Sequence, residues 1–441
     1  MSLKFGTDGV RGVANTELTP ELVVALGRAA ARVLGGSEFI IGRDTRVSGP
    51  MLQAALSAGL AAEGALVTDL GVLPTPAVAF LSAQRKVPAA MISASHNPFP
   101  DNGIKLFAPG GRKLPDDVEE RLEAELLERA APEPRSGAEV GRLAVMADAD
   151  RSYLDHLVVA LEGRTLEGLK VALDCGNGAA SGIAGEAYRR LGAEVLEINC
   201  QPDGLNINDG CGSTHPEQLQ QIVVDARADA GLAFDGDADR VLAVDHTGAV
   251  VDGDHMMAIC AIDLHERGVL ADDTVVVTVM TNLGFRLAMA ERGVNVVETQ
   301  VGDRYVLEGL ERGGYTVGGE QSGHVIFRQL ATTGDGLLTG LLLLDVVRRK
   351  RRPLAELAEV MTRLPQVLRN VPVASREGLD AAAGLWDEVA AVESQLYGKG
   401  RVLLRPSGTE PLVRVMVEAP TESAAAAAAD RLVTAVEREL A

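Results

Sequence analysis

One structural plan recurs three times along the chain. In each copy an apolar run typical of a strand leads into a polar or glycine-bearing loop, a helical pattern and the tetrad G-[AV]-x-V. The strand-like runs are 39–41, 171–173 and 275–277, and the tetrads begin at Gly64, Gly192 and Gly293. Each glycine suits the end of a helix, and the valine that closes each tetrad can start a strand. The pattern therefore predicts three β-α-β units.

The last part of the chain follows a different plan. Residues 402–404 and the alternating Val413, Val415 and Val417 predict two strands of a half-buried sheet. Residues 421–440 predict a closing helix that is rich in alanine. We expect boundaries that divide the chain into segments 1–150, 151–250, 251–365 and 366–441.

Composition excludes several classes of protein. The 42 basic residues against 62 acidic ones leave a net charge of −20, and only 3% of residues are aromatic, which argues against a nucleic-acid binder. The four cysteines lack C-x-x-C spacing, so we expect no zinc site or dense disulfide framework. The N-terminus lacks a secretory pattern, and the most apolar window, 337–347, is too short to cross a bilayer. We expect a cytoplasmic protein that does not associate with membranes.

The first loop that carries chemistry is S-A-S-H-N-P at 93–98, directly after the apolar run 89–92. Ser95 is a candidate nucleophile, with His96 beside it and Lys105 further on. A serine hydrolase would need glycines around the serine on a tight elbow, and they are absent here. A polar turn without catalytic function is the alternative.

The second loop carries Asp235, Asp237 and Asp239 after an apolar, strand-like stretch. Carboxylates at alternate positions of an extended chain point the same way, so the three can converge on one cation. An EF-hand is excluded, because Arg240 and His246 stand where glycine and glutamate are required. Three carboxylates that leave room for a phosphate oxygen or water suit Mg²⁺. A solvated acidic turn is the alternative.

The third loop, at 318–324, frames Glu320, Ser322 and His324 with glycines. An acceptor, a hydroxyl and an imidazole suit the hydroxyl groups of a sugar, although a plain tight turn fits the pattern equally well.

The fourth loop places polar groups suited to a phosphate around a turn. Two arginines, two hydroxyls and an exposed glycine backbone can cradle such an anion. These residues are Arg405, Ser407, Gly408, Thr409 and Arg414. A β-turn with a surface arginine is the alternative. Together the four loops supply a nucleophile, a metal site, a sugar reader and a phosphate clamp, which points to phosphoryl transfer on a sugar phosphate.

The chain resembles the α-D-phosphohexomutase family over nearly its whole length. The heptad G-T-D-G-V-R-G at 6–12 opens the resemblance, and the four loops follow in the family's order. The resemblance implies an α/β protein: three similar α/β domains with mixed sheets sandwiched by helices, plus a smaller C-terminal α+β domain, around one central cleft. The four segments would bear, in order, the phosphoserine, the metal, the sugar site and the phosphate site.

The resemblance also implies residue roles. Ser95 would be carried as phosphoserine, with Arg11, His96 and Lys105 as further catalytic residues. The general base is His96 or Lys105, and the sequence does not choose between them. Ser95, Asp235, Asp237 and Asp239 would hold Mg²⁺. The substrate-binding residues would be Arg240, Asp303, Arg304, Glu320, Ser322 and His324. The phosphate would be gripped by Arg405, Ser407, Gly408, Thr409 and Arg414.

Within the family, the stretches at 211–217 and 301–306 and Gln321 favour members that act on an amino sugar. Hexose-specific members often carry methionine where this chain has Gln321, and Ala238 stands where glycine is common. The expected partner is a small sugar phosphate, with a sugar 1,6-bisphosphate as activator and intermediate, and homodimer formation is left open. The alternatives are a hexose-phosphate mutase of the same family, a non-catalytic sugar-phosphate sensor and a Mg²⁺-dependent phosphatase.

Overall fold

The computed structural model describes residues 9–127, 134–375, 378–407 and 411–440. By their internal contacts the residues form two compact units. One unit comprises Met1–Met280 with Gly293–Val360, and the other comprises Thr281–Arg292 with Met361–Ala441. The first unit contains three mixed sheets, and the second contains one antiparallel sheet.

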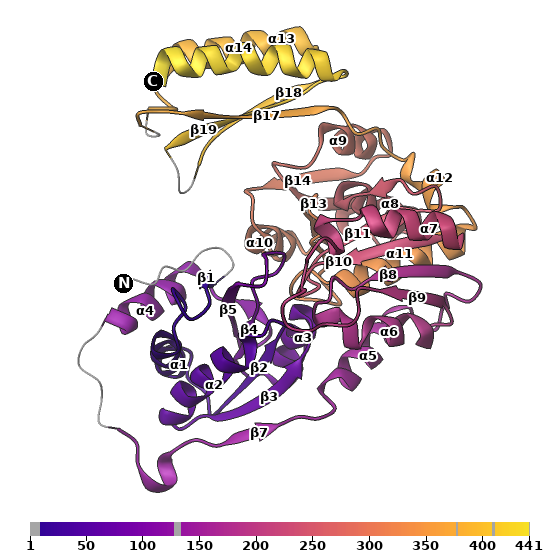
Figure 1. Cartoon of the computed structure of the whole chain (residues 1–441). Coiled ribbons are helices and arrows are strands. Elements are labelled where there is room, and N and C mark those ends of the chain that lie inside the picture. Colours follow the sequence, from indigo (N-terminus) through magenta and orange to yellow (C-terminus); the bar gives the residue numbers. More distant parts are fainter. Residues whose placement is uncertain (1–8, 128–133, 376–377, 408–410, 441) are drawn as a thin grey trace. The chain divides into compact units, whose positions relative to one another are not determined.

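The first sheet has the strand order β1-β5-β4-β2-β3-β7 (Figure 1). A further strand, β6, pairs with β5. Its strands are β1 (Val10–Val13), β2 (Glu38–Arg43), β3 (Leu66–Val72), β4 (Ala89–Ile92), β5 (Asp101–Ala108), β6 (Arg112–Lys113) and β7 (Leu143–Val145). The helices of this part are α1 (Pro20–Leu34), α2 (Gly49–Ala62), α3 (Thr75–Arg85) and α4 (Asp116–Leu127).

Helices cover both faces of this sheet because successive residues of a strand point to opposite sides. Phe39 and Ile41 of β2 join the core that α1 and α2 also form. Gly42 faces the other way, where an added Cβ would lie 2.4 Å from Val78 of α3. Alternation along one strand therefore explains the α/β/α layering.

The second sheet has the order β12-β11-β10-β8-β9. Its strands are β8 (Lys170–Asp174), β9 (Glu194–Ile198), β10 (Ala230–Phe234), β11 (Val241–Asp245) and β12 (Val250–Val251), and its neighbouring helices are α5 (Ala149–Ala160), α6 (Ala184–Arg190) and α7 (Glu217–Ala226). A Cβ on Gly231 of β10 would contact Val223 of α7. The next residue, Leu232, approaches Gly340 of α11 (Gly336–Lys350). This sheet is thus also covered on both faces.

The third sheet has the order β14-β13-β15-β16. It is built from β13 (Thr274–Thr278), β14 (Asn295–Thr299), β15 (Val317–Gly319) and β16 (Val325–Phe327), with α8 (Gly253–Glu266), α10 (Asp303–Gly313) and α12 (Leu354–Ala358) in the same unit. Gly309 of α10 packs over Val276 of β13, and Met257 of α8 lies against Gly319 of β15.

The three predicted β-α-β units are confirmed. Strands β2 and β3, β8 and β9, and β13 and β14 pair in parallel. The glycines that open the tetrads, Gly64, Gly192 and Gly293, have φ values of +89°, +90° and +72°. Glycine adopts these left-handed conformations without steric cost, which explains why each helix can turn sharply into the next strand.

The second unit is an α+β structure with the strand order β17-β19-β18. It consists of β17 (Gln366–Pro372), β18 (Arg401–Pro406), β19 (Leu412–Glu418), α13 (Ala383–Leu396) and α14 (Glu422–Leu440). The two expected strands and the closing helix are confirmed, whereas β17 and α13 were not expected. The helix of the third repeat, α9 (Leu283–Glu291), belongs to this unit, since Leu283 N–H donates to Glu418 Oε2 at 2.8 Å.

The most apolar window of the sequence forms the buried part of α11. Asp335 caps the start of this helix by accepting the Leu338 N–H at 2.9 Å. Its last turn carries Arg348, Arg349 and Lys350, where the helix dipole favours cations. Among the helices that the structure describes, none has the length and apolar character needed to span a bilayer.

Candidate active site

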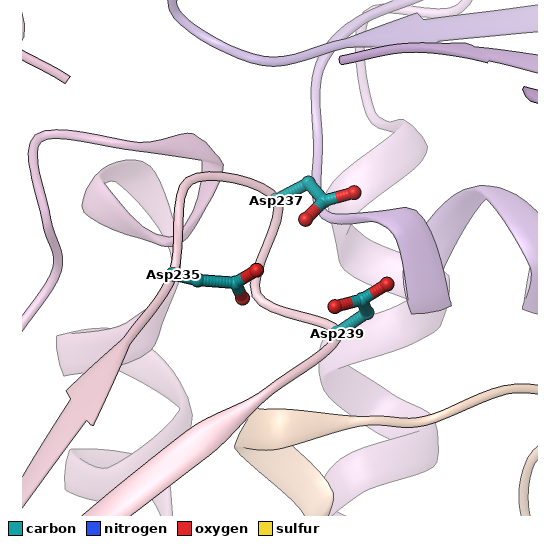
Figure 2. A group of neighbouring side chains, drawn as sticks. All are labelled: Asp235, Asp237 and Asp239. Atoms are coloured by element: carbon teal, nitrogen blue, oxygen red, sulfur yellow. The ribbon is translucent and has the colours of Figure 1, made fainter. Parts of the chain in front are cut away.

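Three carboxylates converge in the loop between β10 and β11 (Figure 2). Ligand atoms of Asp235, Asp237 and Asp239 all lie within 4.8 Å of one another. The loop is a turn rather than the extended chain expected from the alternation, because the Ala238 N–H donates to Asp235 O at 3.0 Å. Ala238 has φ +53°, so a left-handed residue brings the side chains together. The prediction that the three carboxylates converge is confirmed, but a turn brings them together and not an extended chain.

The cluster is suited to a divalent cation. All three carboxylates are buried, and Oδ1 of Asp237 and Oδ1 of Asp239 have no hydrogen-bond partner in the described structure. Burial, together with the charges of Asp239 and Asp237, raises the pKa of Asp235 well above its ordinary value. Buried carboxylates at this spacing require a compensating positive charge. Hard oxygen donors of this kind favour Mg²⁺ or Ca²⁺.

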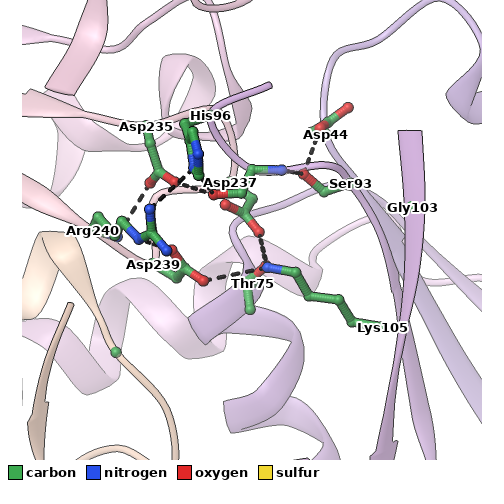
Figure 3. A network of polar contacts seen from close by, with 12 residues as sticks. Asp44, Thr75, Ser93, His96, Gly103, Lys105, Asp235, Asp237, Asp239 and Arg240 are labelled. Atoms are coloured by element: carbon green, nitrogen blue, oxygen red, sulfur yellow. Dashed lines mark hydrogen bonds and ion pairs between the residues drawn. The ribbon is translucent and has the colours of Figure 1, made fainter. Parts of the chain in front are cut away.

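A lysine from the first sheet supplies part of that positive charge. Lys105 on β5 lies between two of the carboxylates, with its Nζ 2.7 Å from Asp237 Oδ2 and 3.3 Å from Asp239 Oδ2 (Figure 3). Thr75, at the start of α3, donates its hydroxyl to Asp237 Oδ2 at 2.6 Å and its N–H to Asp237 O at 2.9 Å. Lys105 was expected at the site, whereas Thr75 was not.

The candidate nucleophile lies in direct contact with the carboxylate cluster. Ser95 follows β4 in a buried turn and donates its hydroxyl to Asp235 Oδ2 at 2.5 Å. Its φ of +54° is a left-handed conformation that costs about 1–3 kcal/mol for a residue with a side chain. Gly236 lies against the same turn, since an added Cβ would be 2.5 Å from Ser95 O. The first and second sheets therefore build this contact together.

His96 and Arg240 lie beside the nucleophile. Arg240 Nη1 is 3.0 Å from His96 Nδ1, and Ser95 Oγ is 3.3 Å from the same nitrogen. Burial and the positive charges of Arg240 and Arg11 lower the pKa of His96, which favours the neutral imidazole. Arg11 reaches this region from β1, where it pairs in register with Gly103 of β5.

The third loop contacts the metal loop through a histidine. His324 is buried, its Nε2 accepts the Gly334 N–H at 2.9 Å, and its Nδ1 lies 3.7 Å from Asp239 Oδ2. Gly302 N–H donates to Glu320 Oε1 at 3.1 Å, and the Ser322 hydroxyl is 3.5 Å from Glu320 Oε2. The Glu320 loop is thus tied both to the start of α10 and to the carboxylate cluster.

The two expected substrate-binding residues at the start of α10 already make ion pairs. Asp303 Oδ2 lies 2.5 Å from Lys113 Nζ and 3.4 Å from His324 Nε2. Arg304 pairs with Asp116 and Glu119 of α4, the second at 2.9 Å. The contacts of Arg304 described by the structure are therefore with α4, and its assignment to the substrate stays a prediction.

The fourth loop belongs to the second unit. Arg405 of β18 and Arg414 of β19 stand opposite each other in the antiparallel register. Burial and the nearby Arg414 lower the pKa of Arg405, which indicates two cations held close together. Ser407 is buried and donates its N–H to Leu412 O at 2.9 Å. Two other residues of the expected clamp, Gly408 and Thr409, lie outside the described residues, as do positions 6–8 of the opening heptad.

The sequence did not indicate the residues that hydrogen-bond to the backbone of the Ser95 turn. Asp44 and Arg46 follow β2, and Asn208 lies in the second α/β segment. Asn208 Nδ2 donates to Ser95 O at 2.9 Å and to Asn97 O at 3.1 Å. The only signal in the sequence was the position of Gly42-Arg43-Asp44 at a strand end, where parallel sheets place functional loops.

Comparison with known proteins covers almost the whole chain. Four parts of the phosphoglucomutase/phosphomannomutase family match in order: α/β/α domain I at residues 2–133, α/β/α domain II at 151–248, α/β/α domain III at 252–364 and the C-terminal domain at 368–435. The chain is 57% identical to a phosphoglucosamine mutase of Saccharopolyspora erythraea and 55% identical to one of Rhodococcus opacus, over 98% of each chain in both cases.

A solved structure shares the architecture. A phosphoglucomutase/phosphomannomutase family protein of Burkholderia thailandensis aligns with a TM-score of 0.83 at 27% identity, covering 99% of this chain and 97% of that one. The three mixed sheets and the antiparallel sheet follow the order of the three α/β/α domains and the C-terminal domain of the family. This chain belongs to the phosphoglucomutase/phosphomannomutase family.

Proposed function

We propose that this protein is a phosphoglucosamine mutase, which interconverts glucosamine 6-phosphate and glucosamine 1-phosphate. The observation that carries the proposal is the 2.5 Å contact between the Ser95 hydroxyl and Asp235 in a buried cluster of three aspartates. Membership of the mutase family supports the reaction class. The names of relatives at 55–57% identity support the amino sugar as substrate.

In the first half-reaction, Ser95 begins as a phosphoserine. The bond between Ser95 Oγ and phosphorus breaks, and a bond from phosphorus to O1 of glucosamine 6-phosphate forms, which gives the 1,6-bisphosphate. The O1 hydroxyl loses its proton in this step, and the departing Ser95 Oγ gains one and becomes a hydroxyl. We assign its acceptance to His96 rather than Lys105, since a lowered pKa keeps His96 neutral and Lys105 is engaged with two carboxylates.

In the second half-reaction the bisphosphate turns over and presents its 6-phosphoryl group to Ser95. The bond from O6 to phosphorus breaks and the bond from phosphorus to Ser95 Oγ forms again. The Ser95 hydroxyl loses its proton in this step, and the departing O6 gains one. Glucosamine 1-phosphate leaves, and the enzyme is again phosphorylated. One clamp must accept either phosphate in turn, and we assign that task to Arg405, Ser407 and Arg414, with Gly408 and Thr409 between them.

The charge balance supports this chemistry. A phosphoserine at neutral pH carries about −1.5 to −2 charges. Lys105 and Arg240 lie at the site to offset that charge and hold the transferring group. A Mg²⁺ ion held by Asp235, Asp237, Asp239 and a phosphoryl oxygen on Ser95 would supply Lewis-acid stabilisation of the phosphoryl oxygens.

In this proposal Glu320, Ser322 and His324 bind the sugar, and Gln321 is the residue that favours an amino sugar over a hexose. Nε2 of Gln321 is buried without a hydrogen-bond partner in the described structure. A buried amide donor of that kind favours a ligand with a polar group to accept from it. We further propose that the four segments 1–150, 151–250, 251–365 and 366–441 each contribute one of the four loops.

The test compares three substrates with Mg²⁺ and a trace of sugar 1,6-bisphosphate: glucosamine 6-phosphate, glucose 1-phosphate and mannose 1-phosphate. We expect a preference of about a hundredfold or more for the amino sugar, on the order of 2.7 kcal/mol in transition-state binding. The matched variant is Gln321→Met, which should reduce that preference. Equal or better turnover of the hexoses would instead identify a hexose-phosphate mutase, and release of inorganic phosphate would identify a phosphatase.

A further inference from the structure

A buried ion pair, Arg46 with Asp44, lies next to the turn that carries the nucleophile. Arg46 and Asp44 follow β2, and the side chains of both are fully shielded from solvent. Arg46 Nε lies 2.9 Å from Asp44 Oδ2, and the Arg46 N–H donates to Asp44 Oδ1 at 2.9 Å. A buried arginine with a carboxylate partner is a costly feature to maintain, so its remaining hydrogen bonds are informative.

The guanidinium of Arg46 holds three carbonyl groups of the nucleophile's turn. Its Nη2 donates to Ser95 O at 2.9 Å and to Asn97 O at 2.8 Å, and its Nη1 donates to Pro98 O at 2.6 Å. A planar guanidinium presents five N–H groups in a rigid fork, whereas an ammonium presents three on a single atom. Lysine at this position could keep the charge but could not satisfy the same acceptors.

Asp44 contacts the N–H group of the same residue, Ser95, through the Ser93 hydroxyl. The Ser93 hydroxyl donates to Asp44 Oδ2 at 2.6 Å, and Ser93 Oγ accepts the Ser95 N–H at 2.9 Å (Figure 3). Ser95 is therefore held at its N–H through Asp44 and at its carbonyl through Arg46. These contacts maintain the left-handed backbone that aims the Ser95 hydroxyl at Asp235.

We propose that Arg46, paired with Asp44, is a positioning residue for phosphoryl transfer, which fixes the Ser95 turn without touching the substrate. The inference rests on the proposed function of Ser95 as the phosphate carrier. Ser95 Oγ must lie in line with phosphorus both when it gives up the phosphoryl group and when it accepts it again. A fixed backbone turn therefore serves both half-reactions. Because the charge of Asp44 balances that of Arg46, the contribution is geometric rather than electrostatic.

The experiment compares the full-length wild type with Arg46→Lys, Arg46→Ala and the control Arg43→Lys. Arg43 is the last residue of β2, next to Asp44 in the chain, but it contacts Gln53 and Asp69 instead of the Ser95 turn. Three quantities are measured: the denaturant midpoint, kcat and KM for glucosamine 6-phosphate, and the rate at which phosphoserine enzyme loses its phosphoryl group to substrate, followed by intact mass after rapid quenching.

We expect Arg46→Lys to unfold cooperatively, to keep a KM near that of the wild type and to lose about 10²-fold in kcat and in the discharge rate, since misplacement by about 1 Å has that effect. Arg43→Lys should match the wild type in both rates. In Arg46→Ala, guanidinium ion below the unfolding transition should restore part of kcat, whereas tetramethylammonium should not.

Two outcomes overturn the inference. Arg46→Lys with wild-type kcat per folded molecule would reduce Arg46 to a structural residue, as would an Arg46→Ala protein that folds and is not rescued by guanidinium. Failure of the proposed function is recognised separately, because the wild type itself would then carry no phosphoryl group on Ser95 and would not turn over the sugar phosphate.

Discussion

The hydroxyl of Ser95 donates a hydrogen bond of 2.5 Å to Oδ2 of Asp235, although 140 positions separate the two residues in the chain. Ser95 belongs to a turn that follows β4, and Asp235 to a turn that follows β10. Each turn holds a non-glycine residue at positive φ, Ser95 at +54° and Ala238 at +53°. Backbone strain of this kind persists where surrounding contacts impose it, and both instances here lie at the candidate site.

Replacement of Ser95 by alanine should abolish mutase turnover while the sugar phosphate still binds. The variant lacks the oxygen that carries the phosphoryl group, but it keeps the expected sugar and phosphate contacts. Turnover is measured with bisphosphate present, binding is measured by titration calorimetry, and intact mass reports phosphorylation. Appreciable turnover in protein purified from a host without its own mutase would contradict the assignment of the nucleophile.

Asp237→Ala should lower kcat by about a thousandfold and displace the Mg²⁺ titration to higher concentrations. A metal ion contributes several kcal/mol to the stabilisation of a transferring phosphoryl group, and each tenfold in rate is about 1.4 kcal/mol. The control is Asp155→Ala, which removes an exposed carboxylate on α5 that pairs with Arg190. An unchanged metal titration for Asp237→Ala would refute the proposed metal site, as would a wild type that keeps full activity in EDTA.

Gly236→Ala should reduce both stability and activity. Its Cβ would lie 2.5 Å from Ser95 O and 2.8 Å from Ile207 Cδ1, so the two turns would have to move apart. Overpacking of this kind costs about 1–3 kcal/mol in the free energy of unfolding. Gly182→Ala is the matched control, since its Cβ would meet nothing within 4 Å. Denaturant unfolding and kcat are measured for both, and wild-type kcat in Gly236→Ala would show that the turns do not depend on this contact.

Asp335→Asn should stabilise the protein above pH 6 and lose that advantage in acid. Burial raises the pKa of Asp335 from 3.8 to about 6, so the fold favours the protonated carboxyl. The stability that this group contributes is complete below its ordinary pKa and is lost as the pH rises through about 6. Asparagine can still accept from Leu338 N–H and Tyr153 Oη, which now bond to Asp335 at 2.9 and 2.8 Å.

The measurement is the free energy of unfolding of both proteins at several pH values between 4 and 8. As the pH rises from 4 to 8, the free energy of unfolding of the variant should increase relative to that of the wild type by on the order of 3 kcal/mol. This corresponds to about 1.4 kcal/mol for each unit by which the pKa is raised. A difference that stays constant with pH would show that Asp335 does not titrate in this range. Asp155→Asn, at an exposed site, serves as the control.

Much of the fold could be predicted because it depends on short-range patterns. The parallel pairs formed by β2, β8 and β13 follow from apolar runs and tetrad glycines that lie within a few tens of residues. Strand β17 and helix α13 were missed, and helix α9 was expected only as part of the third repeat. Within the second unit, Leu283 of this helix bonds to Glu418 of β19, and no local sequence pattern connects these two residues.

The candidate site was predictable to the extent that its residues sit together in the sequence. The three aspartates share one loop, so their spacing alone indicated a cation site. Arg46, Asn208 and Thr75 carry no such signal, because a single arginine, asparagine or threonine after a strand is common. Arg304 is a different case: its motif predicted a substrate-binding role, which stays a prediction, and the structure shows it paired with Glu119 of α4.

The sequence by itself determined the three β-α-β units, the strand ends at which the loops occur and the set of chemical groups in each loop. Tertiary structure decided which loops meet, that Ser95 bonds to Asp235, and that Arg46 holds three carbonyls of the same turn. The physical reason is that the two kinds of interaction act over different separations along the chain. Periodicity and turn chemistry act between neighbours, whereas buried charges such as Asp237 and Arg46 are stable only where distant segments supply their partners.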